Sequence, residues 1–314
     1  MTDKKILITG AAGFVGMELC IQAKGRGYGV YGLDAFRGGL YSREIKEKRA
    51  EILLSHWDVR VHEVDLLSSE LQIPDDISAV VHAAAMPGLD YSWRNPSRYI
   101  QDNEIATLNL IKALTHKHIE KFVLISTSSV YGKHADGSED STLQPISPYG
   151  LTKLAAERLV NLFMPSISSF SIARLFSVYG PGQRPDMGYF KFINAALNDS
   201  PITIFGDGTH SRSNTYIDDA VDGILGVLER GKNAEAYNIG GGEEVQLLDA
   251  INTIYALAEK TPNLIFGDSR PGDQLRTSAD IRKANSDFGY QPKTNFVEGI
   301  TNQFNWQRKP GIIR

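Results

Sequence analysis

The sequence predicts an α/β protein with a doubly wound parallel sheet and a smaller C-terminal α/β domain. Short apolar runs alternate with helical periods, a glycine-rich turn follows the first run, and longer glycine-containing turns begin after about residue 176. Continuous apolar runs are typical of strands covered on both faces, and their alternation with helices favours a parallel sheet. Strands are predicted at 6–9, 30–33, 59–64, 79–82 and 122–125, and helices at 14–23, at 42–55 and from 148 onward.

A chain of 314 residues is expected to form about two domains or one large α/β unit. After about residue 176 the predicted turns become longer and are separated by short helices. This change places the first domain at 1–176 and the second at 177–314. Residues 215–235 are apolar at helical spacing, and we expect this segment to pack back on the first domain.

The composition excludes several classes of protein. Lys and Arg number 33 against 37 Asp and Glu, a formal net charge of −4, which argues against a nucleic-acid or membrane-surface partner. The single cysteine, Cys20, cannot form an internal disulfide and is expected to be buried. The N-terminal apolar run covers only 6–10, too short for a secretion signal. We therefore expect a soluble, cytoplasmic protein with no metal site.

A glycine-rich turn lies between the first predicted strand and the first predicted helix. Glycines at this spacing allow a tight turn, a close approach of the backbone to a pyrophosphate, and packing of the helix on the strand. The helix N-terminus then offers free N–H groups to the phosphates. The predicted cofactor contacts of this turn are Gly10, Gly13, Phe14, Val15 and Gly16.

An acidic residue closes the second predicted strand. Asp34 follows Gly16 by 18 residues, where a carboxylate can accept a hydrogen bond from a ribose hydroxyl. Its charge would repel a 2′-phosphate, so the sequence favours NAD over NADP, although Arg37 nearby weakens that preference. Together the turn and Asp34 predict a dinucleotide site.

Tyr149 and Lys153 lie one turn apart in the helix predicted from residue 148. A lysine ammonium stabilises a phenolate, so we expect Lys153 to lower the pKa of Tyr149 and make it a base near neutral pH. A plain surface pair is the alternative for an isolated tyrosine and lysine at this spacing. The opposite, packed face of the helix is predicted to carry Leu151, Leu154, Ala155, Leu159 and Leu162.

With these motifs in place, the sequence resembles the extended short-chain dehydrogenases/reductases, within the NAD-dependent nucleotide-sugar epimerase/dehydratase family. The resemblance covers nearly the whole chain and implies a Rossmann-type sheet. It rests on the segments 9–16, 65–66, 82–85, 126–132, 174–180, 216–219 and 270–273, together with Asp34, Asn103, Tyr149, Lys153 and Arg212.

The resemblance implies NAD as the cofactor and assigns further positions to it. Lys153 would also bind the nicotinamide ribose, and Asn103 would brace the strand ends near the cofactor. Asp65 and Leu66 would contact the adenine, and Ala83, Ala84 and Ala85 would line the nicotinamide side.

The resemblance also implies a UDP-sugar substrate. Thr127 and Ser128 would position the sugar O4 beside Tyr149, with Ser129 next to them. Further along the chain, Ile204 and Phe205 would flank the uracil, Arg212 and Arg270 would hold the pyrophosphate, and Asp273 would hold the ribose.

The residues after Thr127 separate the branches of the family. Sugar 4,6-dehydratases resemble Thr-Asp-Glu at this place and UDP-glucuronate decarboxylases resemble Thr-Ser-Glu, whereas this chain has Ser128 and Ser129 and no carboxylate. The resemblance therefore favours 4-epimerisation, in which a base and a hydride acceptor suffice. Loop 179–187 is similar to that of UDP-glucuronate 4-epimerases.

Arg184 in that loop is expected to pair with a substrate carboxylate, although it could instead brace the loop or touch a phosphate. Ser177 replaces the asparagine usual in UDP-glucose 4-epimerases, a change compatible with the glucuronate branch. Ser213 and Asn214 depart from the family pattern and leave the packing of their loop open.

Several alternatives stay open. The substrate could be UDP-glucose or UDP-N-acetylglucosamine, or the reaction could be the decarboxylation of UDP-glucuronate. The chain could also be a reductase that releases NADH, or a dinucleotide sensor without activity. Related enzymes are usually dimers, and the helices near 97–115 and 149–163 are expected to form a homodimer interface.

Overall fold

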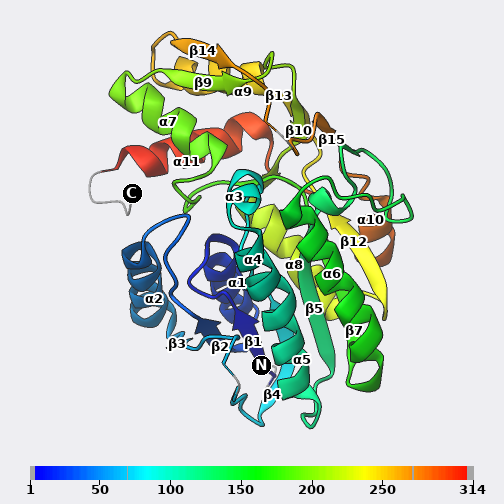
Figure 1. Ribbon diagram of the computed structural model, residues 1–314. Coiled ribbons are helices and arrows are strands. Elements are labelled where there is room, and N and C mark those ends of the chain that lie inside the picture. The colour runs from blue at the N-terminus through cyan, green and yellow to red at the C-terminus, as the bar shows by residue number, and fades with distance from the viewer. Residues whose placement is uncertain (1–3, 69, 271, 310–314) are drawn as a thin grey trace.

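A parallel sheet of seven strands forms the centre of the molecule (Figure 1) in a computed structural model that describes residues 4–68, 70–270 and 272–309. All neighbouring strands in it run parallel, so the prediction of a doubly wound sheet is confirmed. In spatial order the strands are β12 (Glu235–Ile239), β7 (Ser169–Leu175), β5 (Lys121–Thr127), β4 (Ile77–His82), β1 (Lys5–Thr9), β2 (Gly29–Asp34) and β3 (Val61–Glu63).

Helices cover both faces of this sheet. One face carries α1 (Phe14–Gly25), α2 (Arg43–Trp57), α8 (Ile217–Arg230) and α10 (Arg282–Phe288). The other carries α3 (Leu89–Arg94), α4 (Pro96–Tyr99), the π-helix η1 (Ile100–Ile105), α5 (Ala106–Leu114) and α6 (Pro148–Phe163).

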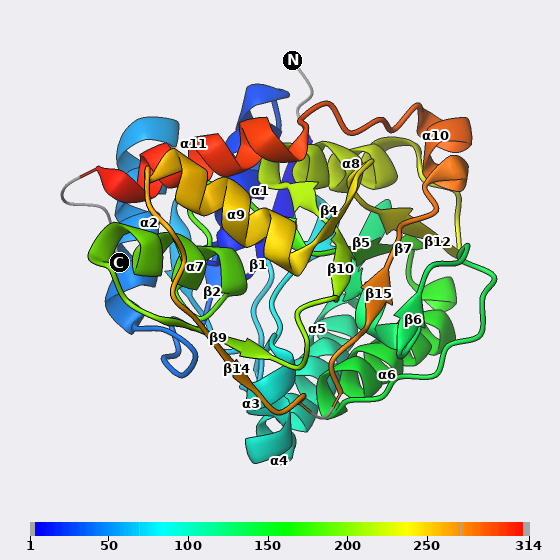
Figure 2. The same ribbon diagram turned by 90° about the horizontal axis from the view of Figure 1, so that it is seen from above.

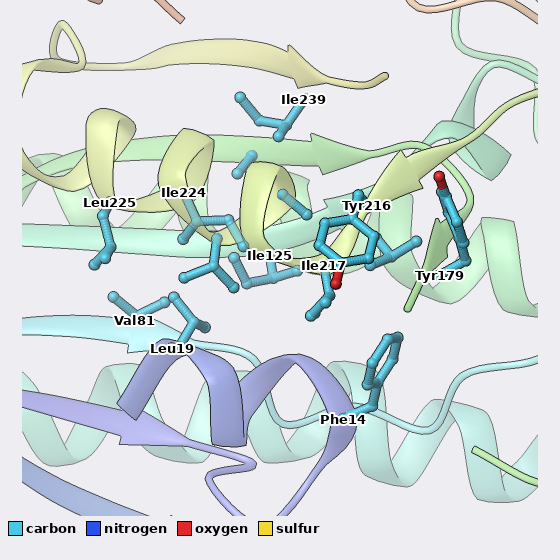
Figure 3. Packing of buried hydrophobic residues seen from close by; sticks show 14 of the residues in the cluster. Phe14, Leu19, Val81, Ile125, Tyr179, Tyr216, Ile217, Ile224, Leu225 and Ile239 are labelled. Atoms are coloured by element: carbon cyan, nitrogen blue, oxygen red, sulfur yellow. The ribbon is translucent and has the colours of Figure 1, made fainter. Parts of the chain in front are cut away.

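The apolar run of β1 shows why the strands are continuous in hydrophobicity. Ile6 and Ile8 are buried under the α1 and α8 face, whereas Leu7 is buried under the α5 and α6 face. Successive side chains of a strand point to opposite sides, so a strand between two helical layers is apolar at every position. Figure 3 shows Leu19 of α1 beside Val81 of β4, in the same buried cluster as Ile224 of α8.

The segment from 215 to 239 joins the large sheet although it follows residue 176 in the chain. Helix α8 packs on α1, β5 and β7, and β12 extends the sheet beyond β7. The domain division at residue 176 stays a prediction, but the sheet itself is built from both parts of the chain.

The rest of the C-terminal part lies over the carboxyl ends of the strands (Figures 1 and 2). Its helices are α7 (Gly188–Asn198), α9 (Leu247–Leu257) and α11 (Phe296–Arg308). Its short strands form three small sheets. In the first, β13 (Glu244–Gln246), β10 (Ser211–Ser213) and β15 (Arg276–Thr277) are joined by β6 (His134–Ala135) from the N-terminal part of the chain. In the others, β11 (Thr215–Tyr216) pairs with β8 (Val178–Tyr179), and β14 (Leu264–Gly267) pairs with β9 (Ile202–Phe205). Two 3₁₀ turns complete the elements, η2 (Ser128–Val130) and η3 (Met164–Ser166).

The prediction for the packed face of α6 is wrong at Leu151 and Leu162, whereas Leu154 and Leu159 are partly buried and pack against hydrophobic clusters. Leu151 and Leu162 are 58% and 73% exposed, whereas Lys153, Ala156 and Val160 are buried. The helix turns its polar catalytic side toward the sheet, because the polar groups find partners there, and leaves an apolar stripe outside.

Cys20 is buried in α1, and burial raises the pKa of its thiol. Across the described ranges, no helix is long and apolar enough to cross a membrane. In the same part of the chain, no group of three or more His, Cys, Asp and Glu side chains could hold a metal ion.

Candidate active site

A cavity of about 650 Å³ lies at the carboxyl ends of the strands, under the C-terminal elements. Ligands of open α/β sheets bind at this edge. Most residues expected in the site line this cavity, and Asn103, Ile204 and Phe205 do not. Those that do are Gly10, Gly13, Phe14, Val15, Gly16, Asp34, Asp65, Leu66, Ala83, Ala84, Ala85, Thr127, Ser128, Ser129, Tyr149, Lys153, Ser177, Arg184, Arg212, Arg270 and Asp273.

The glycine turn between β1 and α1 has no room for side chains. Gly10 has φ +71°, and a Cβ there would lie 2.9 Å from the backbone of Ala84. A Cβ on Gly16 would lie 1.9 Å from the Gly10 carbonyl oxygen. Helix α1 starts after Gly13 without a side-chain cap, which leaves its first N–H groups available to an anion.

Asp34 is held firmly at the end of β2. Its carboxylate accepts from the backbone N–H of Ala12 (3.2 Å) and Phe36 (2.8 Å) and from the Lys46 ammonium (3.2 Å). A carboxylate has about four acceptor sites, so one remains for a ribose hydroxyl. Arg37, which was expected to weaken the preference for NAD, pairs with Asp65 and Asp102. Its guanidinium therefore does not pair with Asp34.

The tyrosine and lysine of α6 face the cavity together. The helix begins after Ser147, whose hydroxyl accepts from the Gly150 N–H at 3.1 Å. Burial raises the pKa of Tyr149, while a hydrogen bond with Thr127 and the charge of Arg184 act in the opposite direction. Burial lowers the pKa of Lys153 to about 8, partly offset by the charge of Glu157.

These pKa shifts change which groups are assigned to lower the pKa of Tyr149. We predicted that Lys153 lowers the pKa of Tyr149, but the groups that do so here are Thr127 and Arg184. The structure therefore gives Arg184 an electrostatic effect on the base in addition to any contact with substrate.

A buried polar network fixes the helix that carries Tyr149 and Lys153. Glu157 lies one turn after Lys153 and accepts from Arg174 at 2.8 and 3.1 Å and from Ser126 at 2.5 Å. Arg174 also donates to the Tyr131 hydroxyl, which donates to Asn238 of β12. The network ties α6 to β5, β7 and β12, so it fixes the catalytic helix on the sheet.

We expect the substitution Glu157→Gln to lower the free energy of unfolding by about 3–5 kcal/mol, because it leaves the buried Arg174 charge without its carboxylate. Urea unfolding followed by circular dichroism measures the change. Glu120→Gln, which removes the exposed partner of Lys4, is the control and should cost less than about 1 kcal/mol. Equal, small effects of the two substitutions would contradict this account of the network.

The turn after β5 places three hydroxyl groups at the cavity. Thr127 Oγ1 accepts from the Ser129 N–H at 3.1 Å, which starts η2. Gln274 donates to the carbonyl oxygens of Ser128 (3.2 Å) and Gly132 (2.8 Å) and so fixes the turn from the C-terminal side.

Arg184 lies in the loop before α7, next to Tyr149. Its Nε and Nη2 donate to the two carboxylate oxygens of Asp186 at 2.9 and 2.8 Å. This fork-to-fork pair fixes the guanidinium plane and leaves Nη1 free of Asp186. Behind it, the buried Arg49 donates to the carbonyls of Ala12 and Gly182, and so joins the glycine turn to the Arg184 loop.

The cavity is also lined by the groups expected to hold the pyrophosphate and the ribose, Arg212, Arg270 and Asp273. Arg270 lies over the Phe205 ring at 4.4 Å and pairs with Asp273 at 3.1 Å. Arg212 donates to its neighbouring carbonyl, and burial lowers its pKa. Pro271 of this motif lies outside the described residues.

Ile204 is not where the resemblance puts it. Its side chain is buried in the hydrophobic core, because alternate side chains of β9 point inward and outward. Phe205, the next residue, is exposed. Only the backbone of Ile204 could reach a base at this strand.

Asn103 does not line the cavity but binds Met86, which does. Its amide accepts from the Met86 N–H at 2.6 Å and donates to the Met86 carbonyl at 3.1 Å and to Thr152 at 3.0 Å. It therefore ties the loop after β4, which does line the cavity, to helix α6.

The departure at Ser213 and Asn214 is accommodated by new hydrogen bonds. Ser213 donates to the Gly241 carbonyl at 2.8 Å, and Asn214 accepts from the Tyr189 hydroxyl at 2.9 Å. Asn214 also donates to the Arg212 carbonyl at 3.2 Å, so the loop positions that arginine.

Sequence reasoning missed Glu157, Asp186 and Gln274. Glu157 could have been found, because it follows Tyr149 and Lys153 at i+8 and i+4 on the same helix face. Asp186 and Gln274 had no such signal, since their roles depend on partners that the fold brings close.

Fold and site define a dinucleotide-dependent enzyme with a tyrosine–lysine pair. A model of the NAD dependent epimerase/dehydratase family matches residues 6–240, and the chain belongs to this family. The prediction of the family and of NAD as its cofactor is thereby confirmed.

Three relatives illustrate the similarity. The uncharacterized UDP-glucose epimerase YtcB of Bacillus subtilis is 39% identical over 95% of this chain and 96% of its own. The UDP-glucuronate 4-epimerase of Thermodesulfobacterium geofontis is 33% identical over 96% of both chains. The crystal structure of UDP-glucuronic acid 4-epimerase from Bacillus cereus with UDP-glucuronic acid and NAD is 39% identical, covers 96% of this chain and 98% of that one, and superposes with a TM-score of 0.92.

Proposed function

We propose that the protein is an NAD-dependent 4-epimerase that converts UDP-glucuronate to UDP-galacturonate. The observation that carries the proposal is Arg184, whose side chain is 13% exposed and lies beside the catalytic Tyr149, in a cavity whose Thr127 turn has no carboxylate. Similarity to enzymes named for UDP-glucuronate supports the same substrate.

Each residue then has a defined task. Bound NAD would accept the hydride from C4 and return it to C4 when the proton returns to O4. Tyr149 removes the proton of the C4 hydroxyl, while Thr127 and Ser128 position that hydroxyl. Thr127 and Arg184 stabilise the phenolate, and Lys153 would bind the nicotinamide ribose. The 4-keto sugar turns about its diphosphate, held by Arg212 and Arg270, and presents its other face. Tyr149 then returns the proton to O4.

Arg184 has a further task with a glucuronate. The 4-keto intermediate is a β-keto acid, which loses CO₂ when the breaking C–C bond aligns with the ketone π system. Arg184 and the Ser128 and Ser129 hydroxyls would hold the carboxylate out of that alignment. Asp186 fixes the Arg184 plane for this purpose.

Product analysis tests the proposal. The purified protein is incubated with UDP-glucuronate, UDP-glucose or UDP-N-acetylglucosamine, and products are read by proton NMR. We expect UDP-galacturonate from the first sugar and much slower turnover of the other two. A UDP-pentose would identify a decarboxylase, consumption of added cofactor with product a reductase, and no product with any sugar a sensor.

A homodimer is proposed through η1 and α6. These two adjacent elements expose five large apolar side chains, which water disfavours on a monomer surface. They are Ile100, Ile105, Leu151, Leu162 and Phe163.

We expect the double substitution Leu151→Glu with Leu162→Glu to convert the dimer to a monomer, because two charges per subunit would be buried at the interface. Light scattering after gel filtration measures the mass. Val297→Glu, at an equally exposed site on α11, is the control and should leave the dimer intact. A wild type that runs as a monomer would contradict the proposed interface.

A cytoplasmic location is also proposed. The buried Cys20 thiol and a site for NAD and a nucleotide sugar support it. Fractionation of cells expressing the tagged protein tests it.

A further inference from the structure

A network of ion pairs borders one end of the active-site cavity. Arg37, in the loop after β2, donates from Nη1 to Asp102 of η1 at 2.6 Å and pairs through Nη2 with Asp65, which follows β3. Arg98, in the adjoining helix α4, also pairs with Asp102. All four side chains line the cavity. We call Arg37, Asp65 and Asp102 the clasp.

The order of the strands in the sheet indicates where the clasp lies relative to a bound dinucleotide. The glycine turn after β1 takes the pyrophosphate and Asp34 at the end of β2 takes a ribose, so the adenosine half extends toward β3. Asp65 follows β3, and Asp102 lies in the helix that follows β4. Strands β3 and β4 are separated in the sheet by β1 and β2. Arg37 therefore joins two segments that follow different strands and border the part of the cavity where the adenosine half is expected.

The clasp side chains are partly exposed to solvent, so their ion pairs can break and form again. The side chains of Arg37, Asp65 and Asp102 are 28%, 44% and 13% exposed. Ion pairs at such sites are individually weak and are screened by salt, whereas one arginine shared by two carboxylates gives a small network. Asp65 is fixed in place, because its other oxygen accepts from the Leu67 N–H at 2.9 Å.

We propose that the Arg37–Asp65–Asp102 clasp closes over the adenosine half of the cofactor and retains it through the catalytic cycle. The inference rests on the proposed function in one respect: an epimerase must return the hydride from the same cofactor molecule, so loss of reduced cofactor at the keto stage ends the cycle. Arg37 acts as a positioning residue and does not touch the reacting atoms.

Cofactor release in the absence of sugar tests the clasp. The protein is loaded with NAD and diluted, and the release rate is followed by intrinsic fluorescence at 50 mM and 500 mM NaCl. We expect Arg37→Gln and Asp102→Asn each to release NAD roughly tenfold faster than wild type at low salt. The double variant should be no faster than Arg37→Gln, and high salt should accelerate wild type but not Arg37→Gln.

The chain offers a matched control. Arg26 also bridges two carboxylates, Asp222 and Glu229, and is 27% exposed, but it lies outside the cavity lining. Arg26→Gln should release NAD at the wild-type rate and with the wild-type salt dependence. Arg37→Lys, which keeps a charge, should restore part of the retention.

Two results would overturn the clasp: equal release rates for wild type and both single variants, or equal acceleration by salt in wild type and Arg37→Gln. Neither depends on the sugar, so a wild type that fails to epimerise UDP-glucuronate would refute the proposed function and leave this test intact. With epimerisation established, Arg37→Gln should release free NADH during turnover, seen at 340 nm in the filtrate.

Discussion

Replacing Tyr149 by Phe is expected to lower kcat for epimerisation by at least 1000-fold, with NAD still bound. The phenol is the base placed at O4, held by Thr127 and near Arg184. General acid–base catalysis contributes about 10² to 10⁴ in rate, and here one group acts in both directions of proton transfer. Single-turnover measurements with UDP-glucuronate and cofactor content after gel filtration give the two readouts.

A matched tyrosine on α9 provides the control. Tyr255 is buried away from the cavity, and Tyr255→Phe removes a hydroxyl without touching the site. It should leave kcat within a factor of two of wild type. If Tyr149→Phe kept a tenth or more of the wild-type rate, another group would have to be the base.

Replacing Arg184 by Met is expected to lower kcat/KM for UDP-glucuronate by about 100-fold or more, because a buried carboxylate would lose its charged partner. The loss should be much smaller for UDP-glucose, which has no carboxylate at C6. Steady-state kinetics on both sugars measure the difference. Arg276→Met, at an exposed arginine paired with Glu244, is the control and should change neither value.

The same substitution should move the pH profile. Activity requires Tyr149 without its proton, so kcat/KM rises as the pH passes through its pKa. Arg184 lowers that pKa. Without the guanidinium the pKa is higher, and the rising limb should shift to higher pH with either sugar. Arg184→Lys keeps a positive charge, so kcat/KM should rise at a pH closer to that of the wild type. An unshifted limb in Arg184→Met would show that the arginine binds substrate without acting on the base.

Most of the sheet could be predicted from the sequence, since both faces of each central strand are buried and the runs are apolar throughout. Two strands of this sheet, β7 and β12, were not predicted. In β7, serines alternate with apolar residues at its start, so it lacks a continuous apolar run. Strand β12 follows residue 234, and a short strand so late in the chain gives no sign of which strand it pairs with. The face of α6 was predicted wrongly for a different reason. Leucines usually mark the buried face, but here the buried face holds Lys153 and Glu157, which the polar network beneath the cavity stabilises.

The candidate site was predictable where its parts lie close in sequence. The glycine turn, the Thr127 turn and the tyrosine–lysine pair each occupy a few residues and line the same cavity. What the sequence could not give was the pairing of groups across segments. The Arg184–Asp186 fork, the contact of Gln274 with the Thr127 turn and the bridge from Arg37 to Asp102 depend on distances that only the fold sets.

The central claim is that one hydride leaves C4 and returns to C4 within a single binding event. UDP-glucuronate labelled with deuterium at C4 tests it most directly, with mass spectrometry and NMR of the product after many turnovers. We predict UDP-galacturonate that keeps the deuterium at C4. Loss of the label to unlabelled cofactor in solution, or formation of a UDP-pentose in place of UDP-galacturonate, would contradict it.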